Sequence, residues 1–229
     1  MRAEFALLFW PVATVAIYFA GRALYRRWGH WYSSPMLTTP AALILLALGL
    51  HTSYGDYLQG SHWLMAMIGP LTVAFALPIY DQRAVIRRHW LSLTVGVLVG
   101  SVIAIATGYA LAVVLDLSPE LRQSLLPRSV TMPFAMNVSG HTGGLPQLTA
   151  VFVMITGIVG AALGDIVLKI LPLRSAMARG ALFGMAAHGA GVAKAREVGA
   201  EEGSVAGLVM ILAGLANVAV APALIMALA

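Results

Sequence analysis

The residues best suited to chemistry lie in one stretch, PRSVTMPFAMNVSGHTGGLP (127–146), which combines an arginine, a histidine and several hydroxyl groups with prolines and glycines. Arginine forms paired hydrogen bonds with carboxylates, and main-chain amides freed at a helix N-terminus favour anions. The chain has no Lys, Arg, Asp or Glu over Ser129–Gly164, so this polar stretch lies inside a run otherwise suited to a membrane. The combination is typical of a binding site for a small carboxylate.

Two further stretches have the same character. ALFGMAAHGAGVAKAREVGAEEG places His188 in an apolar segment beside two glycines, and an ionisable residue at membrane depth is a candidate for function. GPLTVAFALPIY (69–80) has two prolines and a threonine, and is either a pocket-lining or a kinked packing helix. The predicted substrate-binding residues are Arg128, Ser129, Thr131, Asn137, Ser139, His141, Thr72 and His188. The predicted backbone or hinge residues are Pro70, Pro78, Pro127, Pro133, Gly143, Gly144, Pro146, Gly189 and Gly191.

Some of these assignments have structural alternatives. Arg128 could instead extend to the membrane surface, which would make 127–146 an external loop. His141 could bind a substrate, relay a proton or only hydrogen-bond a carbonyl. Asp165 could couple a cation or pair with Lys169 at i,i+4, and the pairing is the favoured interpretation.

Motifs of other function classes are missing from the sequence. It has no nucleotide-binding loop, zinc-protease motif or serine-hydrolase motif. It also has no cysteine, and no His/acid cluster has metal-ligand spacing. We therefore predict a protein that is not an enzyme and has no metal or cofactor. The net charge of +5 comes from basic residues in short connections, which predicts membrane topology rather than nucleic-acid binding.

The elements that must position the candidate residues are membrane-spanning helices. The 229-residue chain is 60% hydrophobic and 10% charged, with a mean hydropathy of +0.86. A soluble domain typically has about 25% charged residues. Several charge-free runs reach the roughly 20 apolar residues that a spanning helix needs. The predicted fold class is an all-α polytopic membrane protein.

About six helices are predicted to cross the membrane, and two shorter segments, 120–141 and 178–196, are predicted to enter it and return to the same side. Basic clusters follow the first, third and fifth spans, and such clusters lie in the cytoplasm. All three can do so only if both shorter segments are re-entrant. The charged residues Lys194–Glu202 are predicted to form a solvated loop. The predicted spans are 5–21, 37–55, 61–80, 91–115, 146–170 and 203–228.

The organisation predicted from these elements is one integral membrane domain, 1–229, with N-terminal helices in 1–60 and a core in 61–229. A weak internal repeat, P-x-[TS]-V, occurs at Pro70 and Pro127, and corresponding interrupted segments mark the central site of many transporters. Pairs of small residues four apart predict close helix packing. The broken helices are predicted near 69–80, 127–146 and 180–196, and the small-residue pairs are Gly96–Gly100, Gly160–Gly164 and Gly180–Gly184.

Three motifs, in this order along most of 35–229, resemble the LrgB/CidB (YohK-type) family of membrane proteins. GPLTVAFALPIY fits the family's Gly-Pro-x-Thr-Val-Ala-x-Ala-x-Pro-x-Tyr. PRSVTMPFA with the later GGLPQLTA resembles Pro-[KR]-Ser-Val-Thr-x-Pro-x-Ala followed by Gly-Gly-x-Pro-x-Leu-Thr-Ala. HGAGVAKAREVGAEEG resembles the block His-Gly-x-Gly-Thr-Ala-[RK]-Ala with its acidic tail. Val192 stands where the family pattern has a threonine, which argues against a hydroxyl ligand there.

The resemblance implies two functions. Members of the family are described as holin- or antiholin-like modulators of murein hydrolase activity and cell lysis, which act with a small LrgA/CidA-type membrane protein. The plant plastidic glycolate/glycerate transporter is similar to a fusion of both parts, and some bacterial pairs are implicated in pyruvate uptake. The residues favour transport, because a holin does not need broken helices that carry arginine, histidine and hydroxyl groups.

We therefore predict a membrane transporter, or the main subunit of one, for small monocarboxylates such as glycolate, glycerate or pyruvate. The carboxylate would bind at the termini of broken helices. The alternative is a holin/antiholin-like modulator of murein hydrolase activity and cell lysis. The predicted partners are the carboxylate substrate, membrane lipid, an LrgA/CidA-type small membrane protein and further copies of the chain. The predicted location is the bacterial inner (plasma) membrane, with several crossings.

Overall fold

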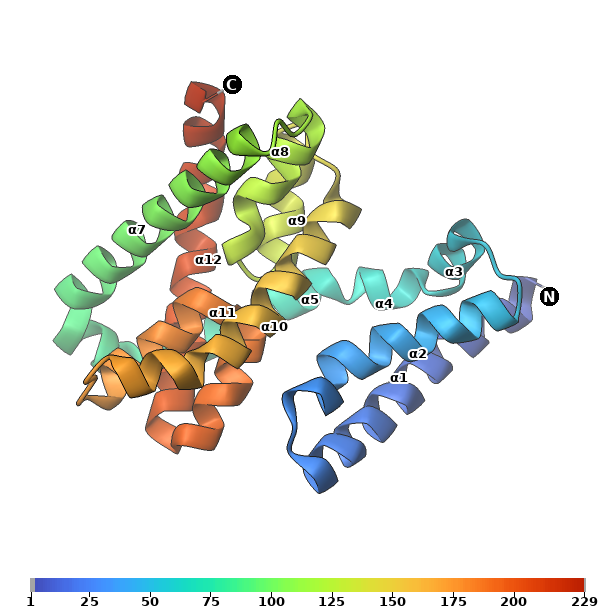
Figure 1. Ribbon diagram of the computed structural model, residues 1–229, viewed down its shortest axis with the longest axis horizontal. Helices are drawn as coiled ribbons and strands as arrows, with labels where there is room; N and C mark the ends of the chain where they lie inside the picture. Colours follow the sequence, from blue (N-terminus) through green and yellow to red (C-terminus); the bar gives the residue numbers. More distant parts are fainter. Residues whose placement is uncertain (1–2, 229) are drawn as a thin grey trace. The chain divides into compact units, whose positions relative to one another are not determined.

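The protein, described here by a computed structural model, consists of helices joined by short connections (Figure 1). The structure describes the backbone of residues 3–228 and the side chains of residues 7–30, 32–220 and 223. No strand occurs in that described backbone. In chain order the elements are α1 (Ala3–Trp28), η1 (Trp31–Ser33), α2 (Pro35–Gly49), α3 (Tyr54–Gly60), α4 (His62–Ala66), α5 (Ile68–Ala74), α6 (Ala76–Asp81), α7 (Arg83–Val114), α8 (Pro119–Leu125), η2 (Leu126–Ser129), α9 (Met132–His141), α10 (Pro146–Ile170), α11 (Ala176–Val198) and α12 (Ala200–Leu228).

Five helical segments of the described residues are long and apolar enough to cross a membrane, and a bent helix pair raises the number to six. This confirms the prediction of an all-α polytopic membrane protein. The first span continues beyond its predicted end at residue 21, and the fourth begins before residue 91. The five segments are Leu7–Trp28, His62–Asp81, Arg83–Val114, Pro146–Ile170 and Ala200–Val220.

The first compact unit of the chain is Met1–Leu71. Helices α1 and α2 approach closely at Gly21, where a Cβ atom would lie 2.7 Å from the hydroxyl oxygen of Thr38. Trp10 of α1 is fully buried, and its ring centre lies 5.1 Å from that of Tyr57 of α3 in an edge-to-face arrangement. Aromatic packing therefore holds α3 against α1.

The prediction of one continuous span over 37–55 is wrong. Helix α2 has 15 residues and ends at Gly49, which gives a length of about 22 Å, less than the ~30 Å hydrocarbon core of a bilayer. His51, with a φ of 50°, turns the chain, and the Ser53 hydroxyl then caps α3 by accepting a hydrogen bond of 3.1 Å from the amide of Asp56. The axes of α2 and α3 differ by 116°, so the pair is a broken span or a re-entrant loop.

The predicted span 61–80 is divided into the short helices α4, α5 and α6. Proline has no N–H to donate to the carbonyl four residues before it. Pro70 therefore leaves the carbonyl of Ala66 free, and α4 ends at Ala66. Pro78 leaves the carbonyl of Ala74 free, and α5 ends at Ala74. Both predicted proline interruptions are present, and each falls one turn before its proline.

The second compact unit is Thr72–Ala229. Its core includes Leu93 of α7, which packs with Leu208 and Val209 of α12. A buried polar pair joins the same two helices, because the amide nitrogen of Asn217 donates a hydrogen bond of 2.7 Å to the hydroxyl of Ser101. Such interhelical hydrogen bonds stabilise helix pairs in lipid, where apolar packing has little hydrophobic drive.

Glycines allow α11 to pack closely against both α10 and α12. A Cβ atom on Gly160 of α10 would lie 2.8 Å from the carbonyl oxygen of Ala186. A Cβ atom on Gly184 of α11 would collide with the main chain of Ala206 in α12. The close packing predicted for these two small-residue pairs is confirmed. Gly96, in the third pair, has no such neighbour within 4 Å, so the prediction is wrong for that glycine.

Candidate functional site

The segment from α8 to α9 forms a hairpin whose base lies at the start of α10. The amide of Leu145 donates a hydrogen bond of 2.7 Å to the hydroxyl of Ser124 in α8. The hydroxyl of Thr149 in α10 lies 3.0 Å from the carbonyl oxygen of Ser124 and 2.7 Å from the hydroxyl of Ser139 in α9. Both arms of the hairpin therefore meet α10 within its first turn. We call 119–141 the first hairpin and these contacts its clasp.

The tip of the first hairpin is a break between η2 and α9. Val130 and Thr131 have extended backbone, with ψ angles of 156° and 146°. Pro133 has no N–H for the carbonyl of Ser129, and η2 ends at Ser129. Val130 belongs to a buried cluster with Val153 of α10, one turn beyond Thr149. The chain therefore turns back within the predicted segment 120–141, and we call residues 127–131 the first tip.

Helix α11 forms the second hairpin (176–198), which enters from the other end of α10. Phe183 packs on Gly164, Ala187 on Gly160 and the ring of His188 on Gly157, so the first arm runs toward the middle of α10. At His188 the backbone leaves the helical region, with φ 36° and ψ −120°. The positive φ belongs to this histidine and not to Gly189 beside it.

The second arm then returns toward the end of α10 from which the first arm came. Gly191 comes so close to the carbonyl of Phe183 that a Cβ atom would collide with it. The ammonium group of Lys194 lies 2.9 Å from the carboxylate of Asp165 in α10, next to the glycine that Phe183 contacts. The chain therefore turns back on itself within the predicted segment 178–196, and we call His188 and its two neighbours the second tip.

The two tips meet beside the middle of α10. Helix α11, which carries the second tip, is in contact with η2, which leads into the first tip. Val153 and Gly157, the α10 residues beneath the first and second tips, are one helical turn apart. Two hairpins that enter from opposite ends of the bundle thus place their irregular backbone at the same depth. Irregular backbone is tolerated at membrane depth only inside protein or against a water-filled cavity.

Three polar side-chain atoms at the tips are buried without a hydrogen-bond partner in the described part of the chain: Nη1 of Arg128, Oγ1 of Thr131 and Nε2 of His188. The guanidinium of Arg128 packs against α7 at Gly108, where a Cβ atom would collide with Nη1. None of the ion pairs among the described residues includes Arg128. An unpaired buried polar group costs about 1–3 kcal/mol, which a bound anion with acceptor oxygens would remove at Arg128 and Thr131.

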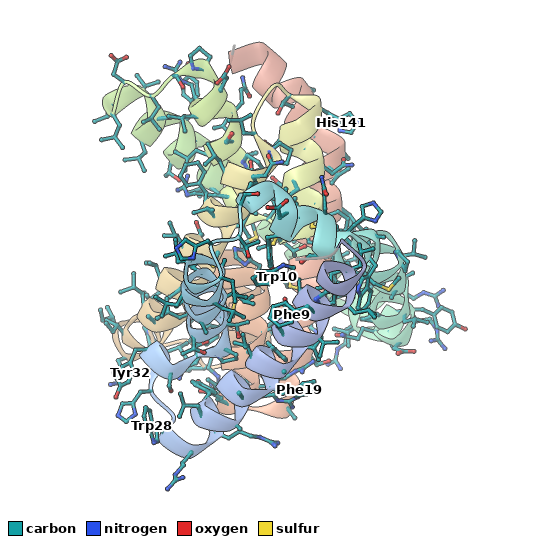
Figure 2. All side chains as sticks on the ribbon, turned by 90° about the vertical axis from the view of Figure 1, so that its right-hand side faces the viewer. Phe9, Trp10, Phe19, Trp28, Tyr32 and His141 are labelled. Atoms are coloured by element: carbon teal, nitrogen blue, oxygen red, sulfur yellow. The ribbon has the colours of Figure 1, made fainter. Side chains whose placement is uncertain are left out.

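Other predicted binding residues lie away from the tips. His141 and Asn137 are exposed on α9, and Nδ1 of His141 lies 2.8 Å from the Asn137 carbonyl within the same helix. In Figure 2 the side chain of His141 stands on the outside of α9. Ser139 takes part in the clasp through its hydroxyl. Among the alternatives for His141, this geometry favours the hydrogen bond to a carbonyl.

The remaining predicted residues have different positions. Ser129 is half-buried at the end of η2, beside the first tip. Thr72 lies on α5, in the segment of short helices. Gly143, with a φ of 86°, Gly144 and Pro146 form the turn between α9 and α10 at the clasp. These three residues shape the base of the first hairpin and not its tip.

Several residues of this arrangement were not predicted from the sequence. Gly108 and Gly157 make room for the Arg128 and His188 side chains. Gly157 lies three and seven residues before Gly160 and Gly164, so the three glycines share one face of the helix. This spacing could have predicted that Gly157 also packs closely against a neighbouring helix. The preferred pairing of Asp165 with Lys169 is wrong, because Asp165 pairs with Lys194.

The charged block after the second tip is also more ordered than the solvated loop predicted for it. Lys194 lies within α11 and contacts Glu197 at 3.0 Å in addition to Asp165. Arg179, in the first arm, binds Glu202 of α12 with Nε 3.0 Å from the carboxylate oxygen. Ion pairs therefore connect both arms of the second hairpin to the neighbouring long helices.

The fold and the paired tips define the class of protein: a multi-pass α-helical membrane protein in which two helical hairpins meet beside one long helix. The comparison with protein families gives the particular group. Residues 14–227 match the model of the LrgB-like family, and the chain belongs to that family. This confirms the resemblance stated from the three motifs.

Three curated relatives match along nearly their whole lengths. The chain is 41% identical to the uncharacterized protein YwbG of Bacillus subtilis, over 93% of this chain and 94% of that protein. It is 31% identical to an uncharacterized protein of Haemophilus influenzae, over 96% and 95% of the two chains. It is 28% identical to the holin-like protein CidB of Staphylococcus aureus, over 93% of each chain. No solved structure matches the chain.

Together, the apolar helices and these relatives identify a multi-pass bacterial membrane protein. The likeness to the plant glycolate/glycerate transporter has no counterpart among these comparisons and stays a prediction.

Proposed function

We propose that this chain has a holin-like function: it modulates murein hydrolase activity and cell lysis from within the membrane. The observation that carries this proposal is the similarity to the holin-like protein CidB over 93% of both chains. The comparisons favour this function over the monocarboxylate transport that the residues led us to expect first. An LrgA/CidA-type small membrane protein and further copies of the chain are its proposed partners.

A second candidate function is the binding and transport of a small monocarboxylate, and the geometry of the tips favours it. The observation behind it is the set of unpaired buried atoms on Arg128, Thr131 and His188. A guanidinium group with no acid beside it can take a carboxylate in two parallel hydrogen bonds. The hydroxyl of Thr131 would hold a second oxygen of a 2-hydroxy or 2-oxo acid. Two hairpins that meet at one depth also suit alternating access, because either one could open without the other.

One pair of measurements separates the two functions. The purified chain is placed in liposomes, alone and with an LrgA/CidA-type partner, and two signals are followed: release of a large trapped dye, and uptake of labelled glycolate, glycerate, pyruvate and lactate. A holin-like lesion releases dye without any added acid. A transporter retains the dye and takes up one acid with saturation, inhibited by the others. Dye release without saturable uptake leaves only the first function.

Arg128→Lys tests the second function at its central residue. Lysine keeps the positive charge but loses the planar pair of donors, so we expect uptake to fall about tenfold or more if Arg128 holds the carboxylate. Arg122→Lys is the matched control, because Arg122 lies in the same hairpin and stacks on Tyr109 at 5.8 Å. Uptake that falls equally in both variants would remove Arg128 from the binding site.

A further inference from the structure

The end of α1 carries a basic groove that belongs to neither proposed function. Phe19, Arg22, Ala23 and Arg26 line an open groove with a volume of about 430 Å³. Their spacing of three, four and seven residues places all four on one face of the helix. The groove therefore has two cationic side chains and an apolar wall along about two turns of α1.

No acidic residue in the neighbouring sequence balances the positive charge of this groove. The sequence contains no Asp or Glu between Glu4 and Asp56, and the Asp56 carboxylate is bound by the Ser53 hydroxyl at 2.7 Å. The ion pairs found among the described residues include neither Arg22 nor Arg26. Like charges four residues apart on a helix repel each other, so an anion from outside the chain would stabilise this end of α1.

Aromatic side chains place the groove at a membrane–water interface. Trp28 and Tyr32 are 54% and 49% exposed and lie toward the same end of the α1–α2 pair, whereas Phe19, 56% exposed, lies nearer the middle of α1 (Figure 2). Tryptophan and tyrosine concentrate where a membrane-spanning helix passes the lipid headgroups. Leu7–Trp28 is long and apolar enough to cross a membrane, and Arg22 and Arg26 lie in its last two turns, so we expect them near the lipid headgroups.

We propose that this groove binds the headgroup of an anionic phospholipid from the surrounding bilayer. Arg22 and Arg26 hold the phosphate oxygens in charge-assisted hydrogen bonds, and an acyl chain lies along Phe19 and Ala23. A phospholipid matches the groove because its phosphate is anionic and its acyl chains are apolar, whereas the groove has cationic and apolar side chains. Lys and Arg side chains close to the end of a membrane span attract anionic lipid headgroups by this chemistry. A free phosphate would use only half of the groove.

The test uses the full chain in phosphatidylcholine nanodiscs with increasing fractions of phosphatidylglycerol. Bound phosphatidylglycerol is counted by native mass spectrometry, and the thermal unfolding midpoint is measured in parallel. We expect Arg22→Gln/Arg26→Gln to weaken phosphatidylglycerol binding about tenfold and to abolish the rise in midpoint that this lipid produces. Both arginines are exposed, so the variant should unfold at the unchanged midpoint in pure phosphatidylcholine.

Two controls make the result specific. Arg87→Gln/Arg88→Gln removes the same charge from two exposed arginines of α7 and should leave the number of tightly bound phosphatidylglycerol molecules unchanged. Phe19→Ala, which keeps both charges, should weaken binding about threefold through its lost acyl contact. Equal loss in both double variants would overturn the proposal in favour of a diffuse attraction of the lipid. Full competition by inorganic phosphate would overturn it in favour of a site for the free ion.

Discussion

The two hairpins reach the same depth beside α10 but are fixed by different forces. The first hairpin is held at its base by a clasp of neutral hydroxyl and main-chain groups, in which Thr149 contacts both arms. The second is held along its first arm by glycine contacts with α10 and α12, and at its base by ion pairs. One attachment depends on a few directional hydrogen bonds, and the other on shape and charge.

This difference indicates which hairpin can move more readily. Breaking a hydrogen bond that is buried away from water leaves its donor and its acceptor unsatisfied, which costs about 1–3 kcal/mol for each group. The Arg179–Glu202 pair of the first arm includes a carboxylate that is only 8% exposed. Exposed ion pairs, such as those of Lys194 on the return arm, lose little free energy when they exchange for water and salt. Asp165 and Glu197, the acids that Lys194 contacts, have side chains 50% and 44% exposed. We infer that the return arm of the second hairpin is the more mobile part, and three substitutions test the comparison.

The largest effect should come from filling the glycine contact of the second hairpin. In Gly184→Leu the new side chain would collide with the main chain of Ala206, which cannot move aside without displacing α12. We expect the free energy of unfolding in mixed micelles to fall by about 3 kcal/mol. Gly207→Leu is the control, since a Cβ atom on Gly207 has no neighbour within 4 Å. Equal losses in the two variants would mean that close contact with α12 does not hold the second hairpin.

A smaller loss should follow from removing the central hydroxyl of the clasp. Thr149→Val keeps the shape of the side chain but leaves the fully buried hydroxyl of Ser139 without this partner. The expected loss is about 2 kcal/mol of unfolding free energy, with faster hydrogen exchange at the Leu145 amide. Thr107→Val provides the reference, because Thr107 is exposed and its hydroxyl contacts only carbonyls of its own helix. The clasp would be unimportant if Thr149→Val lost no more stability than Thr107→Val.

The sequence predicted the breaks of both hairpins better than their attachments. Pro127, Pro133 and the glycines beside His188 are local signals, because each changes the backbone at or within one turn of itself. The clasp joins Ser124 to residues 21 and 25 positions later, and no pattern within one segment encodes that pairing. Asp165 shows the same limit. The i,i+4 spacing on its own helix predicts Lys169 as its partner, but the partner in the structure is Lys194 of α11.

Two local errors had recognisable signals. The span over 37–55 was extended because its residues are uniformly uncharged, although Ser53 and Asp56 have the spacing of a helix cap and its third residue. The second tip was assigned to Gly189 and Gly191, whereas the strained backbone belongs to His188. A histidine adopts a positive φ only where the surroundings determine it, and here the ring is buried and packs on Gly157 of α10.

The smallest effect, and the most specific, concerns the ion pairs of the second hairpin. Lys194→Gln removes the contacts with Asp165 and Glu197, and because those carboxylates are half exposed, we expect a loss below about 1 kcal/mol. The Debye length falls from about 10 Å at 0.1 M salt to about 3 Å at 1 M. The difference in unfolding free energy between the wild-type chain and Lys194→Gln should therefore shrink as salt is added, while the loss in Thr149→Val should not change.

Lys169→Gln is the matched control, since the ion pairs among the described residues do not include Lys169. A salt-independent loss in Lys194→Gln would mean that the lysine acts through its packed methylene groups, and the contrast between a hydrogen-bonded hairpin and a charge-bound one would then be lost.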